Sequence, residues 1–206
     1  MNNSIREQFS EIQRHRKNLR DELENSKSKG IYEVLGDLYD DYTHFIYEII
    51  QNADDENAKY INIEILDDQV IVKHNGKPFN IEDVESICAI GNSEKKNKIG
   101  RFGIGFKSVF SITDRPIVHS NGFDFAIENF IVPVLIDADD RYAIENKETC
   151  IILPYTDKNS TFSNSICNKV DKLEYREFIF LNSIESIVVN NNGKNIFTFE
   201  KKIEET

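Results

Sequence analysis

The sequence has few cysteines, few glycines, a deficit of positive charge and no long apolar run. Its three cysteines among 206 residues are odd in number and widely spaced. This pattern is typical of reduced packing residues and predicts a cytoplasmic protein without a disulfide framework. The longest unbroken apolar stretch, residues 131–136, is far shorter than the roughly 20 residues that cross a bilayer. We therefore expect no membrane-spanning segment.

Acidic residues outnumber basic ones by 36 to 25, which gives a formal net charge of −11. An acidic balance of this size disfavours direct nucleic-acid binding and a broad grip on an anionic membrane. It still permits a local cationic pocket for a phosphate group.

Hydrophobic residues make up 39% of the chain and charged residues 30%, as expected for an ordered globular domain. Apolar spacing predicts helices near residues 5–23, 40–57, 81–90 and 168–181. Asn80 and Asp83 form a capping-box pattern at the start of the third of these helices. Alternating residues predict hairpins over 60–73 and across 191–193, and a series of strands from 116 to 153.

These elements predict an α+β fold, a two-layer sandwich with a mostly antiparallel mixed sheet and helices over one sheet face. A doubly wound parallel sheet fits poorly, because consecutive strands are joined by short turns. We expect a helical extension over residues 1–29 and one domain over residues 30–206.

Glycine is scarce, yet four of the nine glycines fall between residues 91 and 105. Three of them stand in the run Gly100-Arg-Phe-Gly103-Ile-Gly105, directly before a short predicted helix. Glycines concentrated in this way mark backbone that takes unusual dihedrals or approaches another group closely. A helix N-terminus with exposed amides binds anions, although a tight turn that packs a helix on a strand explains the run equally well. The Rossmann and P-loop patterns are both absent.

A second candidate lies on the predicted helix near residue 50. Glu48, Asn52 and Asp55 are spaced by four and then three residues, so they project from one face. A carboxylate and a carboxamide one turn apart can place a general base beside a magnesium ligand. A solvated polar face is the alternative explanation.

Taken in order, these motifs resemble the GHKL ATPases, a superfamily that includes the ninety-kilodalton heat-shock chaperone, MutL repair proteins, type II topoisomerase ATPase domains and sensor histidine kinases. The runs at residues 45–55 and 99–110 resemble the sacsin-type branch in particular. The similarity covers roughly residues 30–155. It implies a Bergerat fold that binds ATP and Mg²⁺ between the helix that carries Glu48 and the glycine run.

The resemblance also implies roles for individual residues. Glu48 would be the general base, Asn52 the magnesium ligand, and Asp55 a supporting residue one turn further on. A lid over residues 91–99 would close on the nucleotide. The residues implied in nucleotide contact at the glycine run and beyond are Gly100, Arg101, Phe102, Gly103, Ile104, Gly105, Phe106, Lys107 and Thr149.

One turn departs from the superfamily pattern, which has an Asp that accepts the amino proton of adenine. Here the turn reads His74-Asn75-Gly76, with His74 in the place of that Asp. A neutral imidazole nitrogen or the Asn75 carbonyl could accept the proton, whereas a protonated histidine could not. The sequence therefore leaves adenine preference open and predicts weaker binding below a pH of about 6.5.

The function that the resemblance implies is magnesium-dependent ATP binding and slow hydrolysis with lid closure. The chain would then be the ATPase module of a larger chaperone-like, defence or repair assembly. The alternative is a nucleotide-binding switch without hydrolysis that controls protein association. A downstream domain, a partner protein or a nucleotide-dependent homodimer are the expected partners.

Overall fold

The computed structural model describes residues 3–25, 43–89, 105–139, 142, 148–157 and 161–201. Eight strands form one sheet in the order β5-β4-β3-β6-β2-β1-β7-β8. The parallel pair is β1 with β7, and the other neighbouring strands are antiparallel. The strands are β1 (Tyr60–Ile65), β2 (Gln69–His74), β3 (Ile117–Ser120), β4 (Phe123–Glu128), β5 (Val132–Leu135), β6 (Thr149–Pro154), β7 (Ser186–Asn191) and β8 (Lys194–Glu200).

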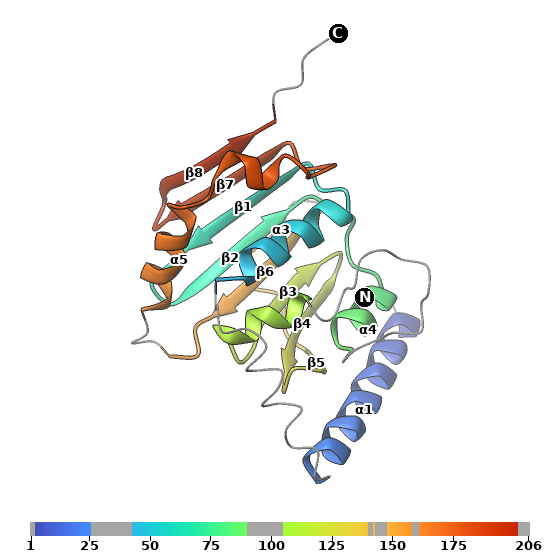
Figure 1. Ribbon diagram of the computed structural model, residues 1–206. Coiled ribbons are helices and arrows are strands. Elements are labelled where there is room, and N and C mark those ends of the chain that lie inside the picture. The colour runs from blue at the N-terminus through green and yellow to red at the C-terminus, as the bar shows by residue number, and fades with distance from the viewer. Residues whose placement is uncertain are drawn as a thin grey trace.

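Helices α3, α4, α5 and η1 lie over the same face of this sheet (Figure 1). The mixed sheet and its helical layer confirm the predicted α+β fold. The helical elements are α1 (Asn3–Asn25), α3 (Phe45–Asp55), α4 (Ile81–Ile87), the 3-10 helix η1 (Gly105–Ser111), α5 (Phe162–Val170) and the 3-10 helix η3 (Tyr175–Phe178).

Local sequence signals explain most of these elements. The residues of β2 alternate between partly exposed and buried positions, as period-2 patterning requires. At the start of α4 the Asn80 side chain accepts hydrogen bonds from Glu82 N and Asp83 N, and Asn80 N donates one to the Asp83 carboxylate. This capping box confirms the predicted one. The β7–β8 hairpin turns through Asn192 and Gly193, whose φ values of 47° and 77° are those of the turns that suit tight hairpins.

The helix predicted over residues 168–181 is wrong. The structure has α5 at Phe162–Val170, a turn at Asp171 and Lys172, and then the short η3. Leu173 and Phe178 are buried, so the apolar pattern imitates a continuing helix, although both residues lie beyond the turn at Asp171 and Lys172 that follows α5. The apolar pattern indicated that these residues are buried, but it did not predict the backbone conformation.

The described part of the predicted extension, α1, packs against β5 and α4. Phe9 is 1% exposed, and its ring meets Phe125 edge-on with 5.9 Å between centroids. Gln13 Nε2 donates a 2.8 Å hydrogen bond to the carbonyl of Pro133. Residues 3–25 therefore contribute to the same core as the sheet.

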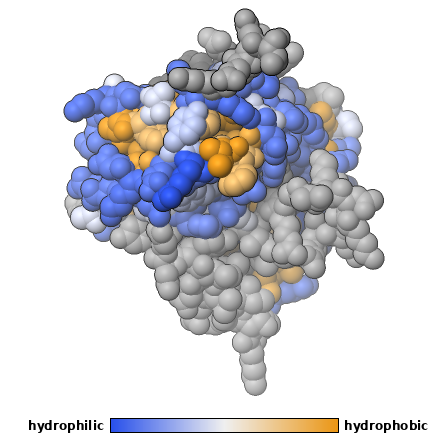
Figure 2. All heavy atoms as spheres, turned by 45° about the horizontal axis from the view of Figure 1, so that its top comes forward, coloured by the Kyte–Doolittle hydropathy of each residue, from blue (hydrophilic) through white to orange (hydrophobic). Residues whose placement is uncertain are grey.

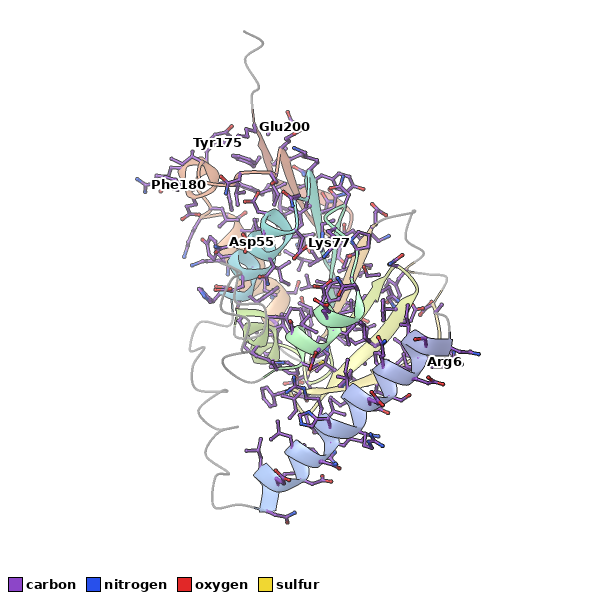
Figure 3. The ribbon with its side chains drawn as sticks, turned by 90° about the vertical axis from the view of Figure 1, so that its right-hand side faces the viewer. Arg6, Asp55, Lys77, Tyr175, Phe180 and Glu200 are labelled. Atoms are coloured by element: carbon purple, nitrogen blue, oxygen red, sulfur yellow. The ribbon has the colours of Figure 1, made fainter. Side chains whose placement is uncertain are left out.

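A hydrophobic surface stands at the end of the molecule that carries β8 and η3. Tyr175, Ile179 and Phe180 are 52%, 54% and 83% exposed. Figure 2 shows apolar side chains gathered on this end, and Figure 3 places Tyr175 and Phe180 at its edge, beyond Asp55. None of the helices in the described ranges is long and apolar enough to cross a membrane.

Candidate functional site

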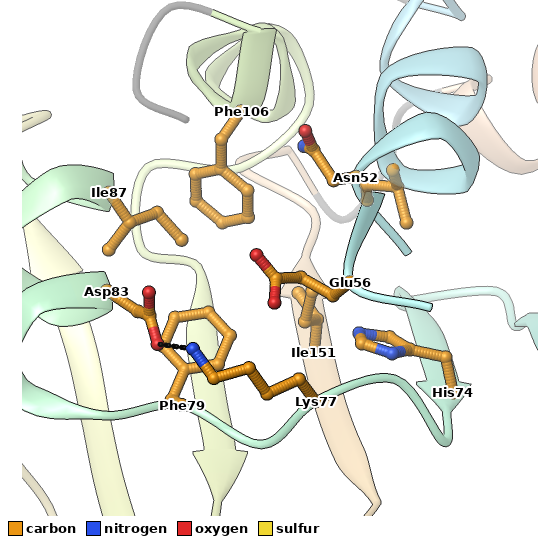
Figure 4. Close-up of a pocket in the computed structure, with 10 residues that line it drawn as sticks. Asn52, Glu56, His74, Lys77, Phe79, Asp83, Ile87, Phe106 and Ile151 are labelled. Atoms are coloured by element: carbon orange, nitrogen blue, oxygen red, sulfur yellow. Dashed lines mark ion pairs between the residues drawn. The ribbon is translucent and has the colours of Figure 1, made fainter. Parts of the chain in front are cut away.

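A pocket opens between α3, α4 and η1 over strands of the sheet (Figure 4). Its cavity volume is about 20 Å³, and the larger empty space of about 450 Å³ around it includes open solvent. Apolar side chains and side chains with hydrogen-bonding groups line it in equal number. The apolar residues are Ile49, Phe79, Ile87, Phe106 and Ile151, and the polar ones are Asn52, Glu56, His74, Lys77 and Asp83.

Such a pocket has the general character of a small-molecule site, with apolar walls and a few placed polar groups. At its mouth Lys77 Nζ stands 3.9 Å from Asp83 Oδ2. This pair brings one positive charge to a wall that otherwise carries carboxylates.

Helix α3 supplies the predicted residues Glu48, Asn52 and Asp55, but they do not share one environment. Asn52 lines the pocket. The Glu48 carboxylate lies beside it against η1, with Oε1 3.1 Å from Nε2 of His44. Asp55 is exposed and is not among the pocket-lining residues. Partial desolvation, and then the charge of Asp54, raise the pKa of Asp55 above its ordinary value.

The contact between Glu48 and Gly105 is the tightest feature beside the pocket. A Cβ added at Gly105 would stand 2.0 Å from Glu48 Oε2 and 2.9 Å from its Cδ, closer than real side chains approach. A side chain at residue 105 would therefore displace the Glu48 carboxylate, whereas glycine leaves it this position. The helix α3 motif and the end of the glycine run, more than fifty residues apart in the sequence, therefore lie against each other.

The glycine run itself falls largely outside the described residues. Gly100, Arg101, Phe102, Gly103 and Ile104, together with the predicted lid at 91–99, are not described. Of the residues that follow, Phe106 lines the pocket with its ring. The implied phosphate contacts of the run stay a prediction.

Lys107 is neither at the surface nor in the pocket wall. Its side chain is 2% exposed, and Nζ donates hydrogen bonds to the carbonyl of Ile87, at 2.6 Å, and to that of Phe130. Burial lowers the pKa of Lys107 to about 8. In this structure the amine fastens η1 to the end of α4 and to the turn before β5.

Thr149 lies opposite His74 in the pairing of β6 with β2. It is 0% exposed, and its hydroxyl lies 2.6 Å from that of Ser120. Ser120 Oγ also accepts a 3.0 Å hydrogen bond from Phe79 N. Thr149 thus supports the strand behind the pocket without being one of its lining residues.

The turn after β2 is closed on the end of α3. Lys77 N donates a 2.7 Å hydrogen bond to the carbonyl of Glu56, and Gly76 N donates a 3.2 Å bond to His74 Nδ1. A Cβ at Gly76 would stand 3.0 Å from His74 Nδ1 and 3.1 Å from Glu56 O. Glycine therefore allows the turn to approach the helix.

The environment of His74 corrects the pH dependence predicted from the sequence. His74 is 5% exposed, and its burial lowers the pKa to about 4, against an opposing effect of Glu148. The imidazole stays neutral at pH values well below 6.5. Protonation of His74 therefore gives no reason for binding to weaken as the pH falls to 6.

Several residues were missed by the sequence analysis. Glu56, Lys77 and Asp83 line the pocket, and His44 contacts Glu48. His44 and Glu48 are four residues apart on a helix, which is a readable signal. The three pocket residues gave no such signal, because only the docking of the turn after β2 on α3 brings them together. Asp54 was also missed, and its carboxylate accepts hydrogen bonds from the backbone N–H groups of residues 182, 183 and 184 at 2.9, 2.7 and 2.9 Å.

Similarity to known proteins supports the sacsin-type part of the resemblance seen in the motifs. Residues 62–148 match the family model described as the Sacsin domain. Protein NO VEIN of Arabidopsis thaliana is 32% identical over 184 residues, which cover 75% of this chain and 7% of that protein. Human Sacsin is 33% identical over 107 residues, which cover 41% of this chain and 2% of Sacsin.

A third relative is HgiDII of Herpetosiphon aurantiacus, named as a candidate type II restriction enzyme. It is 28% identical over 93 residues, which cover 40% of this chain and 15% of HgiDII. The chain therefore spans a small part of each of these relatives. The Sacsin-domain match and the similarity to NO VEIN and Sacsin together support a sacsin-like family for this chain.

Proposed function

We propose that the pocket binds a purine nucleoside triphosphate together with Mg²⁺ and that the chain hydrolyses it slowly. ATP is the nucleotide that the GHKL resemblance implies. The observation that carries the proposal is the contact of Gly105 with the Glu48 carboxylate beside an apolar pocket that Asn52 lines. Glu48, Asn52 and the start of η1 therefore lie close together, which supports the roles of base and metal ligand that we propose for the two side chains.

Apolar walls suit the base of the nucleotide, because a nucleobase buries two flat faces and hydrogen-bonds at its edges. Phe79, Ile87 and Phe106 form such walls. Glu48 stands beside the pocket with its side chain 28% exposed, so water can reach the carboxylate. A partly hydrated carboxylate held by His44 is suited to orient an attacking water molecule.

Magnesium would be held by the side-chain oxygen of Asn52 together with oxygens of the phosphates, since Mg²⁺ takes few protein ligands in phosphate sites. The described residues contain no group of three or more His, Cys, Asp or Glu side chains able to hold a metal ion by themselves. When bound, the ion would neutralise charge that develops on the phosphates.

The wider role that we propose is that of a nucleotide-dependent module in a larger assembly. The chain matches only 7% of NO VEIN and 2% of Sacsin, so such a module would occupy a small part of proteins of that size. Chaperone-like work and repair are compatible with the resemblance. The similarity to HgiDII supports defence as a third setting.

Calorimetric titration tests binding directly. Wild type should bind ATP in the presence of Mg²⁺ and more weakly after chelation, and Asn52→Ala should remove most of the magnesium effect. Gln51→Ala is the matched control, because Gln51 is the exposed neighbour on the same helix. A folded wild type that binds no purine triphosphate would overturn the proposal.

Turnover tests the contact between Glu48 and Gly105. Glu48→Gln should lower hydrolysis by about 100-fold or more while nucleotide still binds. Gly105→Ala should have a similar effect, since its new methyl group forces the Glu48 carboxylate to move. Binding by wild type without any turnover would favour the switch that does not hydrolyse.

A further inference from the structure

His74 lines the pocket, and a hydrogen bond from Gly76 N to its Nδ1 indicates which ring nitrogen carries the hydrogen. We infer that His74 reads the base as a hydrogen-bond donor, so that the pocket prefers a 6-oxopurine, guanine or hypoxanthine, to the 6-aminopurine adenine. This inference rests on the proposed function, because it names the base of the nucleotide bound in the same pocket.

The first step is the tautomer of His74. Its Nδ1 accepts a 3.2 Å hydrogen bond from Gly76 N, so Nδ1 carries no hydrogen. A neutral imidazole then carries its hydrogen on Nε2. Burial keeps the ring neutral, with its pKa lowered to about 4. Near pH 7 His74 therefore offers an N–H donor at Nε2 and no acceptor.

The second step is where this donor is directed. His74 lines the pocket, and its ring points into it (Figure 4). Within the described ranges no residue accepts a hydrogen bond from Nε2, and Nε2 is not among the atoms sealed from solvent without a partner. Toward the described residues, His74, which is 5% exposed, thus keeps one uncommitted donor at the pocket wall. A ligand acceptor there would satisfy it.

The neighbouring Asn75 does not supply the missing acceptor. Its Oδ1 accepts hydrogen bonds from Lys59 N at 2.8 Å and from Tyr60 N at 3.1 Å. Both bonds join the turn to the start of β1, and Asn75 is not one of the pocket-lining residues. Of the two acceptors that the sequence left open for an adenine amino group, neither is available in the structure.

The remaining polar groups of the pocket complement an oxo base. Glu56 and Asp83 bring carboxylate oxygens to the same pocket. A 6-oxopurine has an acceptor, O6, next to a donor, N1–H, which match an imidazole N–H and a carboxylate. We infer that position 6 of the base lies against Nε2; adenine would then present its 6-amino group as a donor, so that donor would face donor. A buried donor without a partner is costly.

Paired nucleotides that differ at position 6 of the base test the inference. ATP, ITP and GTP are titrated into the folded chain with Mg²⁺ at pH 7.5, and CTP is the control for binding through the phosphates alone. We expect ITP and GTP to bind at least tenfold more tightly than ATP. ATP binding as tightly as ITP, or more tightly, would overturn the inference and leave the proposed function intact.

The variant His74→Asp puts an acceptor in place of the donor and should reverse the order, so that ATP binds more tightly than ITP. His74→Asn is its uncharged control. Circular dichroism and urea unfolding establish that each variant is folded; if either variant fails to fold, the comparison on wild type still decides. No binding of any purine triphosphate by folded wild type would instead overturn the proposed function itself.

Discussion

Two loops dock on the C-terminal end of α3, and they are held in opposite ways. The loop at residues 182–184 donates three backbone N–H groups to the carboxylate of Asp54. The turn after β2 is held through backbone instead, by Lys77 N on the carbonyl of Glu56. The first loop is bound by the Asp54 side chain. At the second, backbone groups make the contact, and the side chains of Glu56, Lys77 and His74 line the pocket.

This difference shows how neighbouring acids on one helix come to have different uses. Asp54 is 6% exposed and satisfies backbone donors, Asp55 is exposed, and Glu56 faces the pocket. A carboxylate that already accepts three hydrogen bonds has little capacity for a ligand. Asp54, which holds the loop at residues 182–184, is accordingly not one of the pocket-lining residues.

Removing the Asp54 carboxylate should have the largest effect on stability at either of the two loops. Asp54→Ala leaves three backbone donors of residues 182–184 without their acceptor, and we expect a loss of about 3–4 kcal/mol in the free energy of unfolding. Urea denaturation measures it. A loss below about 1 kcal/mol would show that water replaces the carboxylate.

His74 gives a second large effect, which depends on pH. Its pKa is lowered to about 4 in the folded chain from about 6.5 when unfolded. Between these values the unfolded chain binds more protons, so folding stability falls as the pH drops through this window. The loss attributable to His74 is about 3 kcal/mol. Urea titrations at pH 7, 5.5 and 4 should show wild type losing more stability than His74→Gln, and parallel curves would contradict the assignment.

The Asn75 side chain tests the structural half of the turn after β2. Asn75→Ala removes the acceptor of Lys59 N and Tyr60 N. Both donors are near the surface, where water can reach them, so we expect a moderate loss of about 1–2 kcal/mol. Asn75→Asp keeps an acceptor oxygen and should recover most of the stability. Equal losses in the two variants would assign the effect to packing.

Asp55 should give the smallest effect on stability. Its exposed carboxylate makes Asp55→Ala a change of less than about 0.5 kcal/mol, beside the large cost at Asp54. The same urea measurement on both variants makes the contrast quantitative. A loss at Asp55 that matches the loss at Asp54 would mean that both acids serve the same loop.

Much of the fold was predictable because its signals are local. The alternation in residues 60–73, the cap at Asn80 and the turn at Gly193 each involve residues a few positions apart. The helix predicted at 168–181 was wrong because a turn at residues 171 and 172 ends α5, while Leu173 and Phe178 beyond it are still buried, and apolar periodicity does not register such a break. Local patterns are reliable where the local backbone itself produces the burial.

The site was only partly predictable, for the same reason. Glu48 and Asn52 share a helix, so their relation can be read from spacing. The contact of Glu48 with Gly105 and the placement of Glu56 beside His74 depend on how distant segments dock. The hydrogen bond from Gly76 N to His74 Nδ1 indicates which ring nitrogen is the donor. The sequence could not predict this, because residue identity alone does not fix a tautomer.

The parallel pairing of β1 with β7 has a consequence for how the chain is made. Tyr60 pairs with Ser186, whereas the residues that line the pocket run only from Ile49 to Ile151. As the chain emerges from the ribosome, these lining residues are therefore synthesised before β7, the strand that pairs with β1. Until then β1 is an open edge, ready to pair with another chain, and Asp54 has yet to meet its three amides. We expect the nascent domain to need protection from aggregation during this interval, which ends when residues 182–191 arrive.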